Sequence, residues 1–157
     1  LKKIIIHLKN YNLLITNTNF DLGSNKINNF FDGLKKNFSN LQVHKYLGKD
    51  YFAAMKYSNL MIGNSSAGIR EAPSFKLPVV NIGSRQNGRF REANVIDVDH
   101  SVNEIKNAID RALSQSFAQS ISEIKNPYGD GGSASRIVDI LEKIDLNEDL
   151  INKRIAY

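Results

Sequence analysis

Short apolar runs alternate with segments of helical spacing along most of the chain. The apolar runs are typical of buried strands and occupy residues 13–16, 41–43, 59–62, 79–82 and 95–98. The segments between them have apolar residues three or four positions apart, which predicts helices over residues 1–8, 25–38, 51–57, 67–75, 102–113 and 133–144. This alternation predicts an α/β fold in which helices cover a parallel sheet in layers.

The two ends of the chain and one inner segment are less clear. Residues 1–8 contain three consecutive isoleucines that also fit a strand, but residues 13–16 make the better strand and follow at a tight-loop distance. Residues 116–126 show no clear pattern, and residues 127–132 (PYGDGG) predict a turn cluster. Ser133 or Ser135 is the expected cap of the helix that follows, and residues 146–157 are either a last helix or a tail.

A helix at the start would leave the parallel sheet without the strand that should precede it. We therefore expect residues 1–157 to be a single domain cut just inside its first strand–helix unit, from the C-terminal half of a longer protein.

Composition narrows the function classes. The chain has 157 residues, a hydrophobic content of 41%, a net charge of +5 and no cysteine. The absence of cysteine excludes a disulfide framework and thiolate chemistry. The basic residues are spread along the chain without a run, so nucleic-acid binding is not favoured, and the mild positive charge equally suits a small anion. We find no signal peptide and no apolar run long enough to span a bilayer, so we expect a cytoplasmic location without membrane contact.

Residues 63–89 (GNSSAGIREAPSFKLPVVNIGSRQNGR) carry the candidate chemistry. A buried strand ends before Gly63, and a small polar turn with Ser65 and Ser66 leads into a helical segment that carries Glu71. A strand, turn and helix in this order direct free N–H groups and a positive dipole end at the space above the turn, which suits a phosphate. On this local pattern alone, an ordinary turn with a serine cap is the favoured alternative.

The next strand strengthens the phosphate interpretation. Residues 79–82 also end in a polar, glycine-rich loop, which carries Arg85, Gln86 and Arg89. Open α/β sheets bind ligands at the carboxyl ends of their strands. An arginine is a fork-shaped phosphate donor, and a carboxylate such as Glu71 accepts hydrogen bonds from sugar hydroxyls. The two loops together predict a nucleotide or nucleotide-sugar site.

The same residues resemble a known family. The segments GNSSAGIREAP (63–73), NIGSRQNGR (81–89) and Asn94-Val95 are similar to the UDP-N-acetylglucosamine 2-epimerases. With the loop NFDLGS (19–24), the turn YGDG (128–131) and the segment IDL (144–146), the chain looks most like the hydrolysing branch, which releases UDP and N-acetylmannosamine on the way to sialic acids. The resemblance covers nearly the whole chain.

The resemblance implies a Rossmann-like parallel sheet in three layers, which is the C-terminal, UDP-binding half of a two-domain fold of the GT-B type. The active site would lie between the halves, the catalytic acids and histidine would belong to the other half, and no metal or cofactor would be required. Residues carried over by motif are Ser65, Ser66 and Gly68 at the diphosphate, with the N–H groups of Ala67 and Gly68 as donors, Glu71 at the ribose hydroxyls, Arg85 near the phosphates, Phe52 against uracil and Asn19 lining the cleft.

Each assignment has a purely structural alternative. Ser66 would then be only a helix cap, Glu71 a solvated carboxylate and Phe52 a core residue. Arg85 and Arg89 would only order their loop by pairing with an acidic residue, for which the candidates are Asp21, Glu92 and Asp97. Asp130 is interpreted as a turn residue between glycines, and three scattered histidines as structural or surface residues: His7, His44 and His100.

Three functions therefore remain to be separated. The first is a hydrolysing epimerase acting on UDP-N-acetylglucosamine or a diacetamido relative, with the full-length protein a homo-oligomer and this chain alone a weak, inactive UDP binder. The second is the non-hydrolysing epimerase, which returns a UDP-sugar. The third is a non-catalytic module that binds nucleotide sugars.

Overall fold

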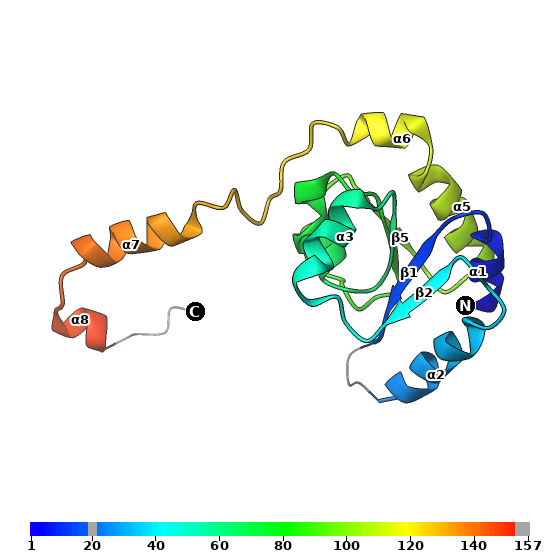
Figure 1. The fold of residues 1–157 in the computed structure, drawn as a ribbon. Helices are drawn as coiled ribbons and strands as arrows, with labels where there is room; N and C mark the ends of the chain where they lie inside the picture. The colour runs from blue at the N-terminus through cyan, green and yellow to red at the C-terminus, as the bar shows by residue number, and fades with distance from the viewer. Residues whose placement is uncertain (19–21, 153–157) are drawn as a thin grey trace.

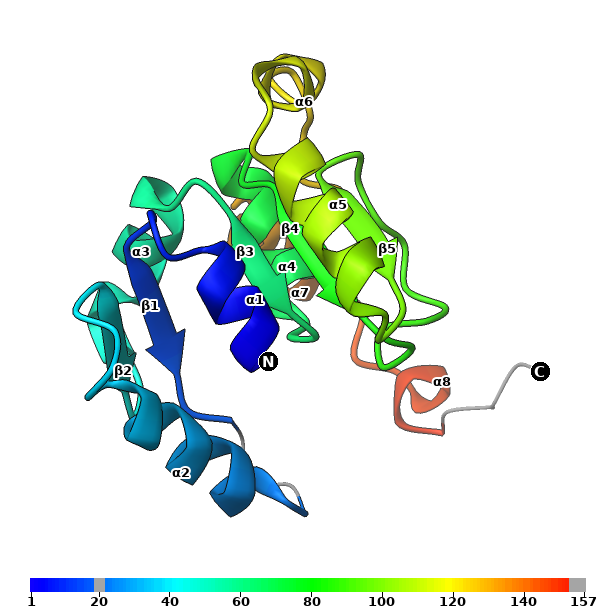
Figure 2. The same cartoon turned by 90° about the vertical axis from the view of Figure 1, so that its right-hand side faces the viewer.

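The computed structural model describes residues 1–18 and 22–152, in which short parallel strands are flanked by helices (Figures 1 and 2). The strands are β1 (Leu13–Thr16), β2 (Leu41–His44), β3 (Met61–Gly63), β4 (Val79–Ile82) and β5 (Val95–Val98). The helices are α1 (Lys2–His7), α2 (Ser24–Leu34), α3 (Tyr51–Tyr57), α4 (Ala67–Arg70), α5 (Val102–Ala112), α6 (Gln115–Ser120), α7 (Ser133–Lys143) and α8 (Glu148–Ile151). Two 3₁₀ turns, η1 (Gly48–Asp50) and η2 (Ala72–Phe75), complete the described elements.

The strands are all parallel, as the sequence predicts, but they form two sheets. β1 pairs with β2, and β4 lies between β3 and β5 in the second sheet. Leu13 of β1 and Ile62 of β3 pack against one hydrophobic cluster that contains Ile4 and Leu8. Side-chain packing beneath α1 therefore joins the two sheets, where a single hydrogen-bonded sheet was expected.

Helices cover both faces of the second sheet, which gives the expected three layers. On one face, Ile4 and Leu8 pack with Val80 of β4 and with the buried side of α5. On the other face, Met55 of α3 packs with Val79 of β4 and with residues of η2. The Rossmann-like α/β class predicted from the sequence is confirmed.

The predicted helix over residues 67–75 is broken in two. α4 ends at Arg70, and η2 continues the segment from Ala72 with Pro73 in its first turn. Proline lacks an N–H and its ring clashes with the carbonyl four residues earlier, so an α-helix does not continue through it. Glu71 lies at the junction between the two pieces.

The predicted helix over residues 25–38 is also shorter. α2 ends at Leu34, where the Asn37 N–H donates to the Leu34 carbonyl and turns the chain back toward β2. Phe38 packs in the same cluster as Leu34 and Leu41 after this turn. A continued helix and a turn would both bring Phe38 to this apolar surface. The spacing of apolar residues therefore does not show where the helix ends.

The segment without a clear pattern contains α6, which the sequence did not predict. Ser114 caps α6 by accepting a hydrogen bond from the Phe117 N–H, and Phe117 is buried. Beyond it, α7 lies apart from the body of the molecule (Figure 1) and buries none of its residues. In the described ranges, no helix is both long and apolar enough to cross a membrane.

Candidate functional site

The two loops singled out by sequence lie next to each other. In the register of the second sheet, Gly63 is opposite Asn81 and Ile82 is opposite Val98, so β3, β4 and β5 end at one edge. The Gln86 Nε2 donates to the Asn64 carbonyl at 2.7 Å, which ties the loop after β4 to the turn after β3. The predicted juxtaposition at the carboxyl ends of the strands is confirmed.

The turn before α4 is open to solvent. Gly63 has φ +150°, a conformation that L side chains rarely adopt, and the next two residues, Asn64 and Ser65, are exposed. The Ser65 hydroxyl accepts a hydrogen bond from the Ala67 N–H at 3.3 Å, and the Ser65 carbonyl accepts from the Gly68 N–H at 3.2 Å. Both N–H groups predicted to bind phosphate are therefore engaged within the turn.

The Ser66 hydroxyl is not spent on capping the helix. Ser66 occupies the position before α4, where its carbonyl accepts from the Ile69 and Arg70 N–H groups, but its side chain makes no capping bond. Across the described residues, neither the Ser65 N–H nor the Ser66 N–H has an acceptor. The donors open to a ligand are thus these two N–H groups and the hydroxyl of Ser66.

Gly68 has a packing role in this structure. It is buried in α4, and a Cβ built on it would lie 2.8 Å from Cγ1 of Val79 on β4. The lack of a side chain lets α4 approach the sheet closely. Its predicted place at the diphosphate stays a prediction.

Glu71 combines burial with an unmet need for a donor. Its Oε2 is buried and has no hydrogen-bond partner. Burial raises the pKa of the Tyr51 phenol above its ordinary value, and the negative charge of Glu71 raises it further. A buried acceptor without a partner costs about 1–3 kcal/mol of stability, because it has lost its hydrogen bonds to water. A hydroxyl donor from a ligand would replace those hydrogen bonds.

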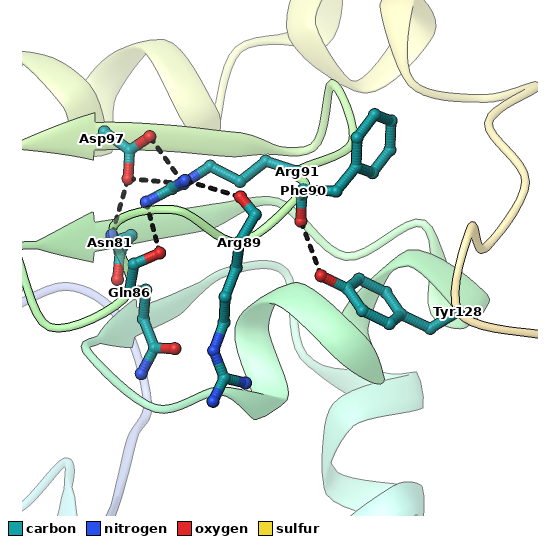
Figure 3. Close-up of polar contacts among 7 residues, drawn as sticks. All are labelled: Asn81, Gln86, Arg89, Phe90, Arg91, Asp97 and Tyr128. Carbon is teal, nitrogen blue, oxygen red and sulfur yellow. Dashed lines mark hydrogen bonds and ion pairs between the residues drawn. The ribbon is translucent and has the colours of Figure 1, made fainter. Parts of the chain in front are cut away.

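One arginine, Arg91, holds the loop after β4, and Figure 3 shows its contacts. Arg91 Nε pairs with Asp97 Oδ2 of β5 at 2.9 Å, while its Nη1 and Nη2 donate to the carbonyls of Arg89 and Gln86. Asn81, which is 2% exposed, donates from Nδ2 to Asp97 Oδ1 at 2.6 Å. We call Arg91, Asp97 and Asn81 the Arg91 clamp.

The Arg91 clamp shows which arginine pairs with Asp97, a point that the sequence left open. Asp97 pairs with Arg91, not with Arg85 or Arg89 as the sequence suggested. Glu92 accepts from the N–H of its neighbour Ala93, and Asp21 lies outside the described residues. Arg85 donates from Nη1 to the Asn64 carbonyl at 3.5 Å, which places its side chain at the turn before α4.

Two predicted ligand residues are placed less directly. Phe52 on α3 is 57% exposed, and its ring stacks on Phe75 with a centroid distance of 6.2 Å. It is therefore not a core residue, and its role against a base stays a prediction. Asn19 lies outside the described residues.

Of the residues interpreted as structural or surface, His44 is exposed, and the others lie in contacts within the fold. His7 of α1 lies 2.8 Å from Asp110 of α5, and His100 lies over Gly83. Asp130 accepts from the Gly132 N–H and pairs with Arg136 at 3.0 Å, so its interpretation as a turn residue is confirmed. The expected serine cap of α7 is wrong, since Gly132 precedes the helix and no side chain caps it.

Arg91 is a site residue that the sequence analysis missed, and Gln86 is one that it named in the polar loop without giving it a role. Gln86 is 3% exposed, and its Oε1 is buried without a partner. Nothing in the local pattern separates them from other polar loop residues, because their partners lie in β5 and in the turn after β3.

A hollow of about 510 Å³ also lies at the carboxyl ends of β4 and β5, lined by Ser84, Asn87 and three acidic residues: Asp97, Asp99 and Glu104. The three carboxylates disfavour an anion in this hollow. No group of three or more potential metal ligands occurs in the described part of the chain.

Comparison with known proteins gives one family. The family model described as UDP-N-acetylglucosamine 2-epimerase matches residues 1–142. A Legionella pneumophila protein named UDP-N,N'-diacetylbacillosamine 2-epimerase (hydrolyzing) is 40% identical over 118 residues, which cover 74% of this chain and 30% of that protein. A Campylobacter jejuni protein named GDP/UDP-N,N'-diacetylbacillosamine 2-epimerase (hydrolyzing) is 40% identical over 114 residues, 71% of this chain and 29% of that protein.

A solved structure agrees on the fold. The S. aureus MnaA–UDP co-structure matches with a TM-score of 0.55 and 22% identity, over 88% of this chain and 46% of that chain. At this identity the likeness shows the fold alone. The chain spans about 30% of the length of the curated relatives.

Proposed function

Because the chain belongs to the UDP-N-acetylglucosamine 2-epimerase family, we propose that it is the UDP-binding half of a hydrolysing UDP-sugar 2-epimerase. The observation that carries the proposal is that one turn–helix segment holds unengaged donors at Ser65 and Ser66 before α4 and an unpartnered buried carboxylate oxygen of Glu71 at the end of α4. Donors suit a diphosphate and the acceptor suits a ribose hydroxyl, so the turn fits both parts of a nucleoside diphosphate.

The proposed reaction begins with elimination of UDP. A base outside this chain takes the proton from C2 of the sugar, the anomeric C–O bond breaks, and its electron pair leaves with the diphosphate as a 2-acetamidoglucal forms. Water then adds to the other face and gives the 2-epimeric free sugar. Donors aimed at the leaving diphosphate bind more strongly as its charge grows, and this lowers the barrier.

The residues of this chain divide that work. Ser66 donates to the diphosphate through its hydroxyl and N–H, together with the N–H of Ser65. Glu71 accepts hydrogen bonds from the ribose hydroxyls, which holds the nucleotide in place with its diphosphate at the turn. Arg85 holds the turn through the Asn64 carbonyl, close to the phosphates.

The sugar is proposed to be an N-acetylated amino sugar. The Legionella pneumophila and Campylobacter jejuni relatives are named for N,N'-diacetylbacillosamine linked to UDP or to GDP/UDP, and a Neisseria meningitidis relative is named for UDP-N-acetylglucosamine, so both sugars are to be tested.

The test is product analysis with the full-length protein. It is incubated with UDP-N-acetylglucosamine or with UDP-N,N'-diacetylbacillosamine, and we expect free UDP and the 2-epimeric free sugar from one of them. A 2-epimeric UDP-sugar would instead establish the non-hydrolysing alternative. Binding of UDP-sugar without turnover would establish the non-catalytic module.

Variants connect the activity to this chain. Ser66→Ala should lower kcat roughly 10²–10³-fold, the effect of removing one donor from a site that stabilises a developing anion. Glu71→Ala should mainly raise the KM for the nucleotide sugar. Ser122→Ala and Glu123→Ala, two exposed positions after α6, are matched controls and should leave both constants unchanged.

A further inference from the structure

The described residues give the Arg89 side chain no partner, although the backbone around Arg89 is held by several hydrogen bonds. Its side chain is exposed and makes no hydrogen bond or ion pair with the described residues, whereas its carbonyl accepts from Arg91 Nη1 at 2.8 Å. The braced backbone fixes where the side chain begins.

The bracing comes from several directions. Arg91 holds the carbonyls of Gln86 and Arg89, and Asp97 and Asn81 hold Arg91 against β5 and β4. Tyr128, from the segment before α7, donates its hydroxyl to the Phe90 carbonyl at 2.9 Å. The backbone of residues 86–91 is thus held by hydrogen bonds on both sides of Arg89, although Arg89 itself faces solvent.

The Arg89 side chain leaves its loop on the same side as that of Gln86. Figure 3 shows it extending in the same direction as the Gln86 side chain, away from the Arg91 guanidinium. Gln86 Nε2 donates to the Asn64 carbonyl, next to Ser65, so Arg89 shares the side of the loop that contacts this turn. The buried Gln86 Oε1 has no partner, which marks the space beside that turn as polar and incompletely satisfied.

We propose that Arg89 binds the diphosphate of the nucleotide and that the Arg91 clamp positions it. The inference rests on the proposed function and adds a binding residue and its support. Arg85 already donates to the Asn64 carbonyl, so it shapes the turn, while Arg89 has donors to give to an anion. A planar guanidinium can bond two phosphate oxygens at once, which a lysine cannot.

The test compares ligands that differ only in phosphate. Affinities of the full-length protein for UDP and for uridine are measured by calorimetry, with competition for the weaker ligand. Arg89→Ala should weaken UDP binding about 10- to 100-fold, the effect of one charge-assisted hydrogen-bonding group, and should change uridine binding less than about twofold. Arg89→Lys should recover part of the loss.

Arg111→Gln is the charge control, because Arg111 lies on α5 over the Phe117 ring, and it should bind UDP like the unmodified protein. Unchanged UDP affinity in Arg89→Ala, or equal losses for UDP and uridine, would overturn the assignment of Arg89. Failure of the unmodified protein to bind UDP would overturn the proposed function itself, which is a separate result.

The positioning role of Arg91 is tested by coupling. Arg91→Ala should weaken UDP binding less than Arg89→Ala does, and it should add little when Arg89 is already alanine, because its effect passes through Arg89. Full additivity of the two changes in binding free energy would overturn the positioning role. Thermal unfolding of each variant identifies any general loss of folding.

Discussion

At the scale of single residues, the site combines polar groups without protein partners and small residues that permit close packing. Ser66 and Glu71 hold the open donor and the open acceptor, and Gly68 lets the helix between them approach β4. The sequence motif marks all three positions. It does not show which of them faces a ligand and which faces the sheet.

Gly68→Ala should destabilise the fold by about 1–3 kcal/mol, because the new Cβ would overlap Val79 in a packed interface. Denaturant unfolding of this chain measures the change. Gly33→Ala is the matched control: Gly33 lies near the end of α2 with nothing within 4 Å of its Cβ position, and alanine there should stabilise by about 0.5–1 kcal/mol. Shortening Val79 to alanine in the Gly68→Ala protein should recover part of the loss, and equal stability of the two glycine variants would contradict the contact.

Asp130 gives a pH-dependent contact at the residue scale. Hydrogen bonds from the Arg136 guanidinium, and from the Gly132 N–H, hold the pKa of the Asp130 carboxyl well below its ordinary range. A carboxyl whose pKa is lower in the folded than in the unfolded state stabilises the fold at any pH above its unfolded-state pKa of about 3.9. This stabilisation is lost as the pH falls through the folded-state pKa. The contact should therefore persist through neutral and mildly acidic solution.

NMR titration of the Asp130 carboxyl carbon checks this expectation. Its midpoint should lie below that of an unperturbed aspartate, and Arg136→Gln should raise it toward about 3.9. An unperturbed midpoint in the unmodified chain would show that the pair is absent in solution.

At the scale of elements, α7 differs from the other long helices. Its large apolar residues are all exposed, in contrast to the buried stripe of α5. They are Ile137, Val138, Ile140 and Leu141, and Ile144, which follows the helix, is exposed as well. An isolated helix of this length is marginally stable in water. Because α7 has no buried residues, packing adds little to its stability in this chain.

Paired substitutions test this difference. Ile109→Ala on α5, where Ile109 is 0% exposed, should cost about 2–5 kcal/mol of unfolding free energy. Ile140→Ala on α7, where Ile140 is 62% exposed, should change it by less than about 0.5 kcal/mol. Denaturant unfolding of this chain measures both, and a large loss for Ile140→Ala would mean that another surface covers this residue.

Prediction from the sequence succeeds where one element decides the outcome. The β1, β4 and β5 boundaries and α3 match their apolar patterns, since each pattern already identifies the buried face. It fails for two other reasons. Pro73 breaks the predicted helix and Ser114 caps α6, and these are local effects that the spacing of apolar residues does not record. The Arg91 clamp depends on distant partners, because it joins residues from two strands and a loop.

At the scale of the whole molecule, the site in this chain is one-sided. In the proposed function, the chain would supply phosphate donors and a ribose acceptor, and none of its described residues is placed as the base that the elimination requires. The chain spans about 30% of the length of its curated relatives.

Residues 1–157 alone should bind UDP weakly and release no UDP from a nucleotide sugar. Calorimetry gives the affinity, and chromatographic detection of UDP gives the turnover, each compared with the full-length protein under the same conditions. Turnover by the isolated chain would mean that it carries its own base.

The join between β1 and β3 has a mechanical consequence. Backbone ladders fix a register, but apolar side chains in contact slide past one another by changing rotamers. The unit of β1, β2 and α2 is therefore held to the second sheet by apolar side-chain contacts and by no strand pairing. A shift of this unit against the second sheet would have to rearrange only those contacts, and every strand pair would stay intact.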